Sequence, residues 1–286
     1  MSKHYKSLLF FMMISVLFIS CSDEKEVVVE PIAAESRLEV SYGAAERQVY
    51  DIYLPKGRSS ETTKVIILIH GGSWVQGSKE DMNFIKDIII SELDDYAVVN
   101  MNYRLATFLA PPFVSPFPTQ TDDITSVVEH LKANASEYQI SDELAFIGSS
   151  AGGQLSLLWS YALDTQKKVN AVVSIVGPTD LSGNDATTFL GQIVGQAGIA
   201  PTKEFFESNS PVFQAKSDSP PTIQFHAGMD ELVARDQGEK LRDRLNELGV
   251  ENEYTIYSQA THDYSNMPLL IYDTWVKTRT FLLKHH

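Results

Sequence analysis

One short stretch of the chain combines the residues needed for nucleophilic chemistry. Ser150 stands between Gly148 and Gly152, after the apolar residues 144–147 and before a helix-forming segment at 151–162. This is the strand–turn–helix context of a nucleophile elbow, in which glycines remove the side chains that would clash in the turn. The hydroxyl of Ser150 would then be exposed at the tip and able to attack an acyl carbon. The alternative interpretation is a glycine-rich turn without chemistry.

A second glycine-rich segment follows another apolar run. His70-Gly71-Gly72-Ser73-Trp74 comes directly after residues 64–69, which are apolar nearly throughout. In acyl transfer a tetrahedral intermediate carries a negative oxygen, and backbone N–H groups that converge on this oxygen stabilise it. Glycines let the backbone turn inward without side chains in the way. A plain glycine turn after a strand is the alternative.

Together the two segments resemble the α/β-hydrolases that carry the HGG-type oxyanion loop of esterases and lipases. The resemblance implies a serine carboxylic-ester hydrolase that forms an acyl-enzyme, with the N–H groups of Gly72, Ser73 and Ala151 as oxyanion hole. Many relatives have a third glycine where this chain has Ser73. Further motifs, spread over residues 38–284, are similar to the acetyl- and feruloyl-esterase-like branch: Asp51-Ile52-Tyr53-Leu54-Pro55, Gly77-Ser78-Lys79, Asn102-Tyr103-Arg104-Leu105, Ser150-Ala151-Gly152-Gly153 and Ser210-Pro211.

The family order places the acid and then the base after the serine. Asp230 follows a strand expected at 222–225, and His262 follows one at 253–257, so both stand at carboxyl ends of strands, where open α/β sheets build their sites. Ser150 would attack the acyl carbon. His262 would take its proton and return it to the leaving group, and Asp230 would fix the imidazole tautomer. The adjacent carboxylates Glu231 and Asp263 are alternatives for the acid.

The other histidines and carboxylates predict no further chemistry. His70 and His226 stand at strand ends, where we expect them to hold the oxyanion and acid loops. No group of His, Cys and carboxylate residues has metal-ligand spacing, and no phosphate loop or dinucleotide fingerprint is present in the sequence. The sequence therefore predicts neither a metal nor a cofactor.

The remaining pattern predicts an α/β-hydrolase fold with a mostly parallel eight-stranded sheet. Strand and helix alternate through most of the chain, which places helices on both faces. Alternating segments at 38–42 and 48–54 predict an N-terminal antiparallel hairpin. The other strands are expected at 64–69, 96–101, 144–147, 169–176, 222–225 and 253–257, and the helices at 81–93, 122–135 with Thr121 as N-cap, 151–162, 236–248 and 269–283.

Two long stretches, residues 106–119 and 177–219, show no regular pattern and are expected to wall the active site. They contain many aromatic residues and prolines, which serve either core packing and loop anchoring or a pocket and lid. These residues are Phe108, Pro111, Pro112, Phe113, Pro116, Phe117, Pro118, Phe189, Leu190, Phe205 and Phe206.

The N-terminal residues predict that the protein is exported from the cytoplasm. An apolar run at residues 8–19 is too short for the roughly 20 residues that span a bilayer and is typical of a signal peptide. Phe18-Ile19-Ser20-Cys21 resembles a bacterial lipobox, which implies lipidation of Cys21, the only cysteine, on an exported lipoprotein anchored in the periplasm or at the cell surface. We therefore expect a signal peptide at 1–20, an acidic tether at 21–36 and a catalytic domain at 37–286. A cleaved signal with an incidental cysteine is the alternative.

The charge of the chain limits the classes of partner that it is expected to bind. The chain of 286 residues has 23 Lys and Arg against 37 Asp and Glu, a formal net charge of −14. So acidic a surface argues against nucleic acid and against electrostatic docking on anionic lipid, and it favours solubility. The expected partner is a small acyl ester or an acylated saccharide, with membrane attachment through the lipid alone. The sequence predicts no oligomeric state.

Three other functions share parts of the pattern. A lipase- or arylformamidase-like hydrolase would use the same groups on other acyl substrates. A serine peptidase of the prolyl-oligopeptidase kind has the same elbow and is expected to carry a large N-terminal propeller. A binding protein on an inactive hydrolase scaffold is expected to lack one member of the triad, whereas Ser150, Asp230 and His262 are all present.

Overall fold

The computed structural model describes residues 31–107, 111–184 and 187–286. The predicted signal peptide at 1–20, Cys21 and Phe108 lie outside the described residues, as does most of the predicted tether. The unit Pro31–His286 is considered by itself. Its first strand begins at Glu35, just before the domain boundary expected at residue 37.

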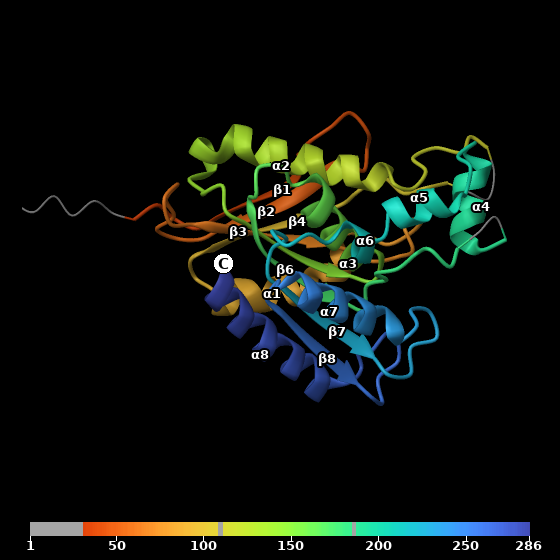
Figure 1. Cartoon of the computed structure of the whole chain (residues 1–286). Coiled ribbons are helices and arrows are strands. Elements are labelled where there is room, and N and C mark those ends of the chain that lie inside the picture. Colours follow the sequence, from red (N-terminus) through yellow and green to blue (C-terminus); the bar gives the residue numbers. More distant parts are fainter. Residues whose placement is uncertain (1–30, 108–110, 185–186) are drawn as a thin grey trace, which may run out of the picture. The chain divides into compact units, whose positions relative to one another are not determined.

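Pro31–His286 is built on one eight-stranded sheet with the strand order β1-β2-β4-β3-β5-β6-β7-β8 (Figure 1). β1 pairs with β2 and β2 with β4 in antiparallel fashion, and the other neighbours are parallel. The predicted mostly parallel sheet with an N-terminal antiparallel hairpin is therefore confirmed. The strands are β1 (Glu35–Ser41), β2 (Val49–Leu54), β3 (Lys64–Ile69), β4 (Tyr96–Met101), β5 (Leu144–Ser149), β6 (Val169–Ile175), β7 (Thr222–Ala227) and β8 (Asn252–Tyr257).

Helices cover the sheet on both sides, as expected (Figure 1). They are α1 (Asn83–Glu92), α2 (Thr119–Tyr138), α3 (Ala151–Leu158), α4 (Phe189–Gln196), α5 (Lys203–Ser208), α6 (Pro211–Gln214), α7 (Asp236–Leu248) and α8 (Pro268–His285), with a 3₁₀ turn η1 (Lys79–Met82) and a π-helical turn η2 (Trp159–Leu163).

The side chains of β3 divide between two core clusters. Val65, Ile67 and Ile69 belong to a cluster that includes residues of α2, α3 and α7. Ile66 and Leu68 belong to a second cluster on the opposite face, with residues of α1 and α8. Because successive side chains of a strand point to opposite faces, a strand that is covered on both faces must be apolar throughout. This explains the unbroken apolar run before His70.

The start of α2 differs from the prediction. The helix begins at Thr119 with Pro118 at the N-cap, so Thr121 is not the cap. The Thr121 hydroxyl instead donates to the Pro118 carbonyl at 2.9 Å, within the first turn. A threonine hydroxyl can bond either forward as a cap or back to a preceding carbonyl, and the sequence does not distinguish the two.

The stretch 177–219 is more regular than predicted. It contains α4, α5 and α6, which Figure 1 shows at the end of the unit toward which the arrows of β7 and β8 point. Thr202 caps α5 by accepting a hydrogen bond from Phe205 N at 3.1 Å. Helices of so few residues lack an extended apolar period, so the sequence pattern does not indicate them.

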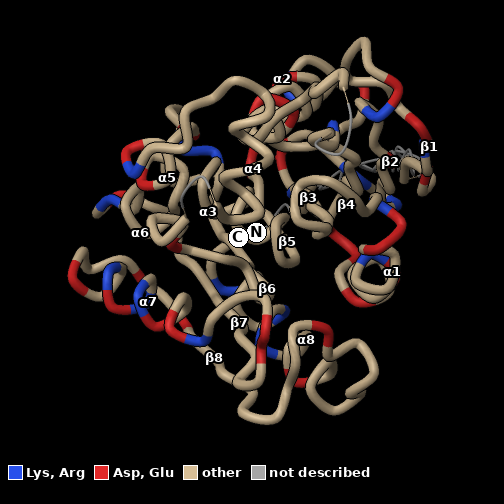
Figure 2. Tube along the Cα trace, turned by 90° about the vertical axis from the view of Figure 1, so that its right-hand side faces the viewer, with Lys and Arg blue, Asp and Glu red and all other residues tan. Residues whose placement is uncertain are grey.

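Charged residues of both signs are interspersed on the surface. Figure 2 shows this along α7, where Arg235 pairs with Glu239 and Lys240 with Asp236. Among the described helices none is both long and apolar enough to cross a bilayer.

Candidate active site

Ser150 lies in the turn between β5 and α3. Its backbone has φ +52° and ψ −120°, a conformation that non-glycine residues rarely adopt. Ser150 N donates to the Ile175 carbonyl at 2.8 Å, which fixes the turn to the end of β6. A Cβ on Gly152 would lie 2.1 Å from the Ile69 carbonyl oxygen, so the turn needs glycine where it passes the end of β3. The turn therefore holds Ser150 at the carboxyl ends of the central strands.

The structure brings the three predicted triad residues together. His262 Nε2 lies 2.9 Å from Ser150 Oγ, and His262 Nδ1 lies 2.8 Å from Asp230 Oδ2. The side chain of Asp230 is fully buried, while 18% of the His262 side chain is exposed. Because the carboxylate can only accept, it fixes the proton of His262 on Nδ1 and leaves Nε2 free to accept from the serine.

Asp230 is itself held by backbone donors. Its Oδ1 accepts hydrogen bonds from Leu232 N and Val233 N, each at 2.8 Å. The loop that carries it is tied to the loop of His262, since Met229 N donates to the Ala260 carbonyl at 2.9 Å. The acid and the base are therefore positioned by one connected pair of loops.

Among the described residues, His262 forms its carboxylate hydrogen bond with Asp230 and with neither alternative acid. Glu231 is exposed. Asp263 accepts a hydrogen bond from Ser265 N at 2.9 Å, and hydrogen bonds from Ser265 lower the pKa of its carboxyl group. Both side chains are thus engaged elsewhere or solvated.

His226 is buried behind the acid loop. Burial lowers the pKa of His226 to about 4, so the ring is neutral at pH 7. Neither ring nitrogen has a hydrogen-bond partner among the described residues. A Cβ on Gly238 would lie 2.4 Å from the ring, which shows how closely α7 packs against it. His226 therefore supports this region through packing.

The segment after β3 lies against Ser150. A Cβ on Gly71 would come within 3.1 Å of Ser150 Cβ. Gly72, Ser73 and Trp74 follow with φ values of +107°, +52° and +64°, and three consecutive positive angles turn the backbone sharply inward. Ser73 thus adopts the left-handed conformation that glycine favours, at the position where many relatives have glycine.

A histidine–tyrosine pair holds this segment from behind. Tyr103 Oη lies 3.1 Å from the carbonyl oxygens of both His70 and Gly71. His70 Nδ1 donates to the same Gly71 carbonyl at 2.6 Å. The two rings stack with centroids 4.1 Å apart. Burial lowers the pKa of His70 to about 4, so the ring is neutral at pH 7 and Nε2 is an acceptor.

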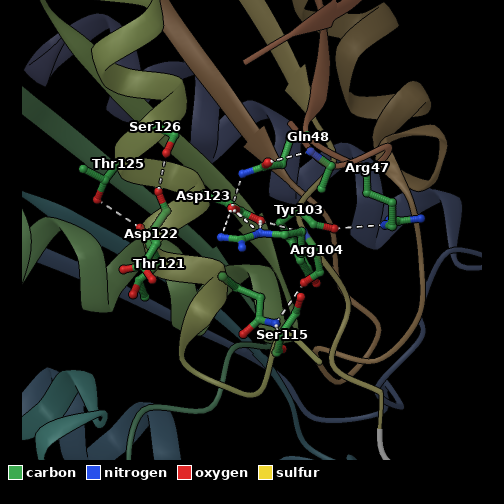
Figure 3. Close-up of polar contacts among 12 residues, drawn as sticks. Arg47, Gln48, Tyr103, Arg104, Ser115, Thr121, Asp122, Asp123, Thr125 and Ser126 are labelled. Carbon is green, nitrogen blue, oxygen red and sulfur yellow. Dashed lines mark hydrogen bonds and ion pairs between the residues drawn. The ribbon is translucent and has the colours of Figure 1, made fainter. Parts of the chain in front are cut away.

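Arg47 links this pair to the rest of the loop. Figure 3 shows its side chain reaching Tyr103, and its Nε donates to the Tyr103 carbonyl at 3.0 Å. Its Nη2 donates to the Gly77 carbonyl at 2.8 Å and lies 3.5 Å from His70 Nε2. No role for Arg47 follows from the sequence, because its partners come from two distant segments of the chain.

A second polar network anchors the following loop. The buried carboxylate of Asp123 accepts hydrogen bonds from Arg104 N, from the Arg104 guanidinium and from Gln48 Nε2, at 2.6–3.1 Å (Figure 3). Gln120 Nε2 donates to the Arg104 carbonyl at 2.9 Å. These bonds fasten the chain after β4 to α2.

The other motif residues form a scaffold for the segment that follows β3. Lys79 Nζ pairs with Asp51 Oδ2 at 2.9 Å, and both side chains are buried. Lys79 N donates to Asn102 Oδ1 at 2.7 Å. The motifs around these residues therefore connect β2, the end of β4 and η1.

The loop aromatics differ in how far they are buried. Phe117 and Phe206 are fully buried. Phe117 lies between Trp74 and Phe205, with ring centroids 5.1 and 6.3 Å away. By contrast, 45% of Phe189 is exposed. Within the described residues no group of three His, Cys or carboxylate side chains could hold a metal ion.

Comparison with known proteins gives a family match over most of the chain. The model of the family described as BD-FAE matches residues 50–245. Esterase LipC of Mycobacterium tuberculosis is 24% identical over 229 residues, which cover 73% of this chain and 55% of LipC. Kynurenine formamidase of Danio rerio is 22% identical over 87% of this chain and 81% of its own length. The chain thus spans about half the length of LipC.

Solved structures share the fold. A truncated carbohydrate esterase from gut microbiota superposes with a TM-score of 0.69, at 22% identity, over 82% of this chain and 91% of that one. Esterase 2 of Thermogutta terrifontis, phosphoramylated by tabun, gives a TM-score of 0.71 at 17% identity. The match covers 88% of this chain and 94% of that one. At these identities the likeness establishes the α/β-hydrolase fold.

Proposed function

The chain belongs to the BD-FAE family, and from that premise we propose that it is a serine carboxylic-ester hydrolase acting on small acyl esters. The observation that carries the proposal is the continuous chain of contacts from Ser150 Oγ through His262 to the buried carboxylate of Asp230, at 2.9 and 2.8 Å. Nucleophile, base and orienting acid in this geometry are the minimum set for covalent acyl transfer.

The proposed reaction has two halves. Ser150 Oγ attacks the carbonyl carbon while its proton passes to His262 Nε2, and the carbonyl oxygen becomes an oxyanion. When the carbon–oxygen bond to the alcohol breaks, His262 returns the proton to the leaving oxygen and Ser150 carries the acyl group. Water then repeats the sequence in place of the alcohol and releases the acid. Asp230 stays ionised throughout and stabilises the transient imidazolium.

The oxyanion would be stabilised by the N–H groups of Gly72, Ser73 and Ala151. The Gly71 carbonyl and the Gly72 N–H belong to one trans peptide unit, so they point in opposite directions. His70 and Tyr103 both bond the carbonyl, which fixes where the N–H points. Positioned donors of this kind need no reorganisation during the reaction, and losing one typically costs about 10²–10³ in rate.

More specifically, we propose that the substrate is a saccharide that carries an acetyl or feruloyl group. It is supported by the expected export of the chain, which favours extracellular saccharide esters, and by the similarity to a carbohydrate esterase from gut microbiota. An arylformamidase-like hydrolase is the second candidate, favoured by the match to kynurenine formamidase over 87% of this chain. Both would use the same triad.

The proposed location is that of an exported bacterial lipoprotein anchored through Cys21. Its support is the lipobox-like sequence alone, and several acyl chains anchor stably where a single one does not. Expression of the full chain with Cys21→Ser should move the protein from the membrane to the soluble fraction. Unchanged partitioning would rule the anchor out.

A hydrolysis panel tests the function. It contains acetylated xylan, feruloylated saccharides, simple acyl esters and N-formylkynurenine, each assayed with the unmodified protein, with Ser150→Ala and with the control Ser126→Ala, at a half-buried serine of α2. We expect ester hydrolysis that Ser150→Ala abolishes and Ser126→Ala retains. Faster turnover of the formamide than of every ester would favour the second candidate. Full ester turnover by Ser150→Ala would overturn the nucleophile assignment.

A further inference from the structure

A cavity of about 450 Å³ lies beside the triad and has no part in the mechanism above. It is on the face of the sheet covered by α1 and α8, which Figures 1 and 2 show on the same side. Its volume is typical of sites for small organic ligands. Its apolar wall is formed by Ile85 and Ile88 of α1, Ile147 of β5, Ile175 of β6, and Ile271 and Trp275 of α8.

The cavity reaches the triad at His262, which lines it. Ser149, the residue before the nucleophile, lines it as well. Ser149 continues the side of β5 on which Ala145 and Ile147 lie in the second core cluster. The cavity therefore begins one residue from the nucleophile, on the imidazole side. Of the described residues that line it, none is an oxyanion donor proposed above.

We propose that this cavity binds the alcohol part of the ester, an inference that rests on the proposed esterase function. The leaving oxygen must receive its proton from His262 Nε2, so the alcohol lies next to the imidazole. The carbonyl oxygen of the ester must face the proposed oxyanion hole, the N–H groups of Gly72, Ser73 and Ala151. A pocket lined by the imidazole and not by those amides is therefore in the place of the leaving group.

The lining also indicates which alcohol fits. The isoleucines and Trp275 offer apolar surface, and the Trp275 indole N–H is already bonded to Glu92 at 2.8 Å. A sugar would have to place most of its hydroxyl groups against this apolar surface, where losing their bound water is costly. The carboxylates of Asp81 and Asp263 line the cavity too, and they would repel an anionic alcohol. The geometry thus points to a neutral alkyl or benzyl alcohol, in place of the saccharide proposed above as the alcohol part of the ester.

The kinetic test compares two ester series. In the first, methyl, butyl and benzyl acetate share one acetyl-enzyme, so differences in kcat/KM report the step in which the alcohol leaves. In the second, methyl acetate, propionate and butyrate vary the acyl group. We expect kcat/KM in the first series to rise about fourfold for each methylene that is buried. Higher kcat/KM for 4-carboxybenzyl acetate than for benzyl acetate, or for acetylated xylose than for butyl acetate, would contradict the proposed alcohol.

Ile85→Trp fills the cavity from α1, and Ile90→Trp is the matched control on the same helix, outside the cavity lining. We expect Ile85→Trp to lower kcat/KM for butyl and benzyl acetate at least about tenfold relative to methyl acetate, with the acyl series unchanged. A change in the acyl series alone, or in neither series, would overturn the assignment. If Ile85→Trp does not fold, Ile271→Trp with the control Val276→Trp replaces it on α8.

A binding measurement separates this inference from the proposed function. Saturation-transfer NMR with benzyl alcohol is recorded on Ser150→Ala and on Ser150→Ala/Ile85→Trp. Binding to the first protein and not to the second supports the cavity even if no ester is hydrolysed, in which case the esterase proposal fails. Ester hydrolysis without any such difference in binding leaves the esterase in place and removes the cavity as the alcohol site.

Discussion

The substitution Asp230→Asn offers a sharp test of how the triad is oriented. It preserves the shape of a fully buried side chain and changes only its hydrogen-bonding pattern. The Leu232 and Val233 N–H groups both donate to Oδ1 at 2.8 Å. In the variant these donors require the amide oxygen at that position. The amide NH₂ must then occupy the position of Oδ2 and face His262 Nδ1.

The energies of the two possible amide orientations decide which one the variant adopts. Flipping the amide would break both backbone hydrogen bonds to this side chain, a cost of about 2–3 kcal/mol at roughly 1–1.5 kcal/mol each. The flipped form is therefore populated at a level of about 1% or a few per cent. In the favoured form Nδ1 must accept from the amide, so the proton of the neutral imidazole moves to Nε2. That nitrogen can no longer take the proton of Ser150.

The expected loss in kcat has two causes, the shift of the His262 tautomer and the loss of the Asp230 charge. The tautomer shift alone predicts a drop of about 30- to 150-fold. The imidazolium formed during the reaction also loses the negative charge beside it, and the combined loss for such a change is about 10⁴. The assay is initial-rate hydrolysis of p-nitrophenyl acetate. Nitrogen-15 NMR of His262 should show the proton moving from Nδ1 to Nε2.

The controls are the two neighbouring carboxylates. Glu231→Gln and Asp263→Asn should each keep kcat within about threefold, because the carboxylate bonded to His262 Nδ1 is that of Asp230. Unfolding measurements should show Asp230→Asn to be folded. If Asp230→Asn retained activity within tenfold, or if either control lost 10³-fold, the assignment of the acid would be wrong.

Tyr103→Phe removes one of the two donors to the Gly71 carbonyl while keeping the ring on His70; kcat should fall about tenfold with little change in KM, and an equal rise in KM would indicate a binding role instead. Ser73→Gly should keep activity and raise stability by about 1 kcal/mol, since Ser73 has φ +52°; lost activity would mean that the Ser73 side chain takes part. Burial holds the pKa of His70 and His226 at about 4. The unfolded chain therefore binds more protons below pH 6.5, so stability should fall as pH drops from 6.5 toward 4, by up to about 1.4 kcal/mol per unit for each histidine. Denaturant unfolding at pH 6.5 and 5 checks this slope, which His226→Leu should reduce; an unchanged slope in that variant would contradict the cause.

Much of the site could be predicted because its parts are local. The elbow is one segment around Ser150, and the positions of Asp230 and His262 follow from strand order, since carboxyl ends of neighbouring parallel strands meet at one edge of the sheet. The family resemblance supplied the motif at Asn102-Tyr103, but not what the tyrosine does. Its bonds to two carbonyls depend on how the end of β4 lies beside the end of β3.

The features that the sequence did not predict depend on tertiary packing. Arg47 bonds groups from two distant segments, and no spacing in the sequence indicates this. The short helices within 177–219 are too brief to show an apolar period. The cavity depends on how far α1 stands from α8, because a residue such as Ile85 reads as ordinary core in the sequence whether its neighbour is a side chain or empty space.

Mass spectrometry of the protein quenched during turnover of p-nitrophenyl acetate shows whether Ser150 carries the acyl group. We expect one acetyl group on the peptide that contains Ser150, placed on Ser150 by fragmentation, and its absence in Ser150→Ala. Acetyl on another residue, or rapid ester turnover that never passes through an acylated Ser150, would contradict this expectation.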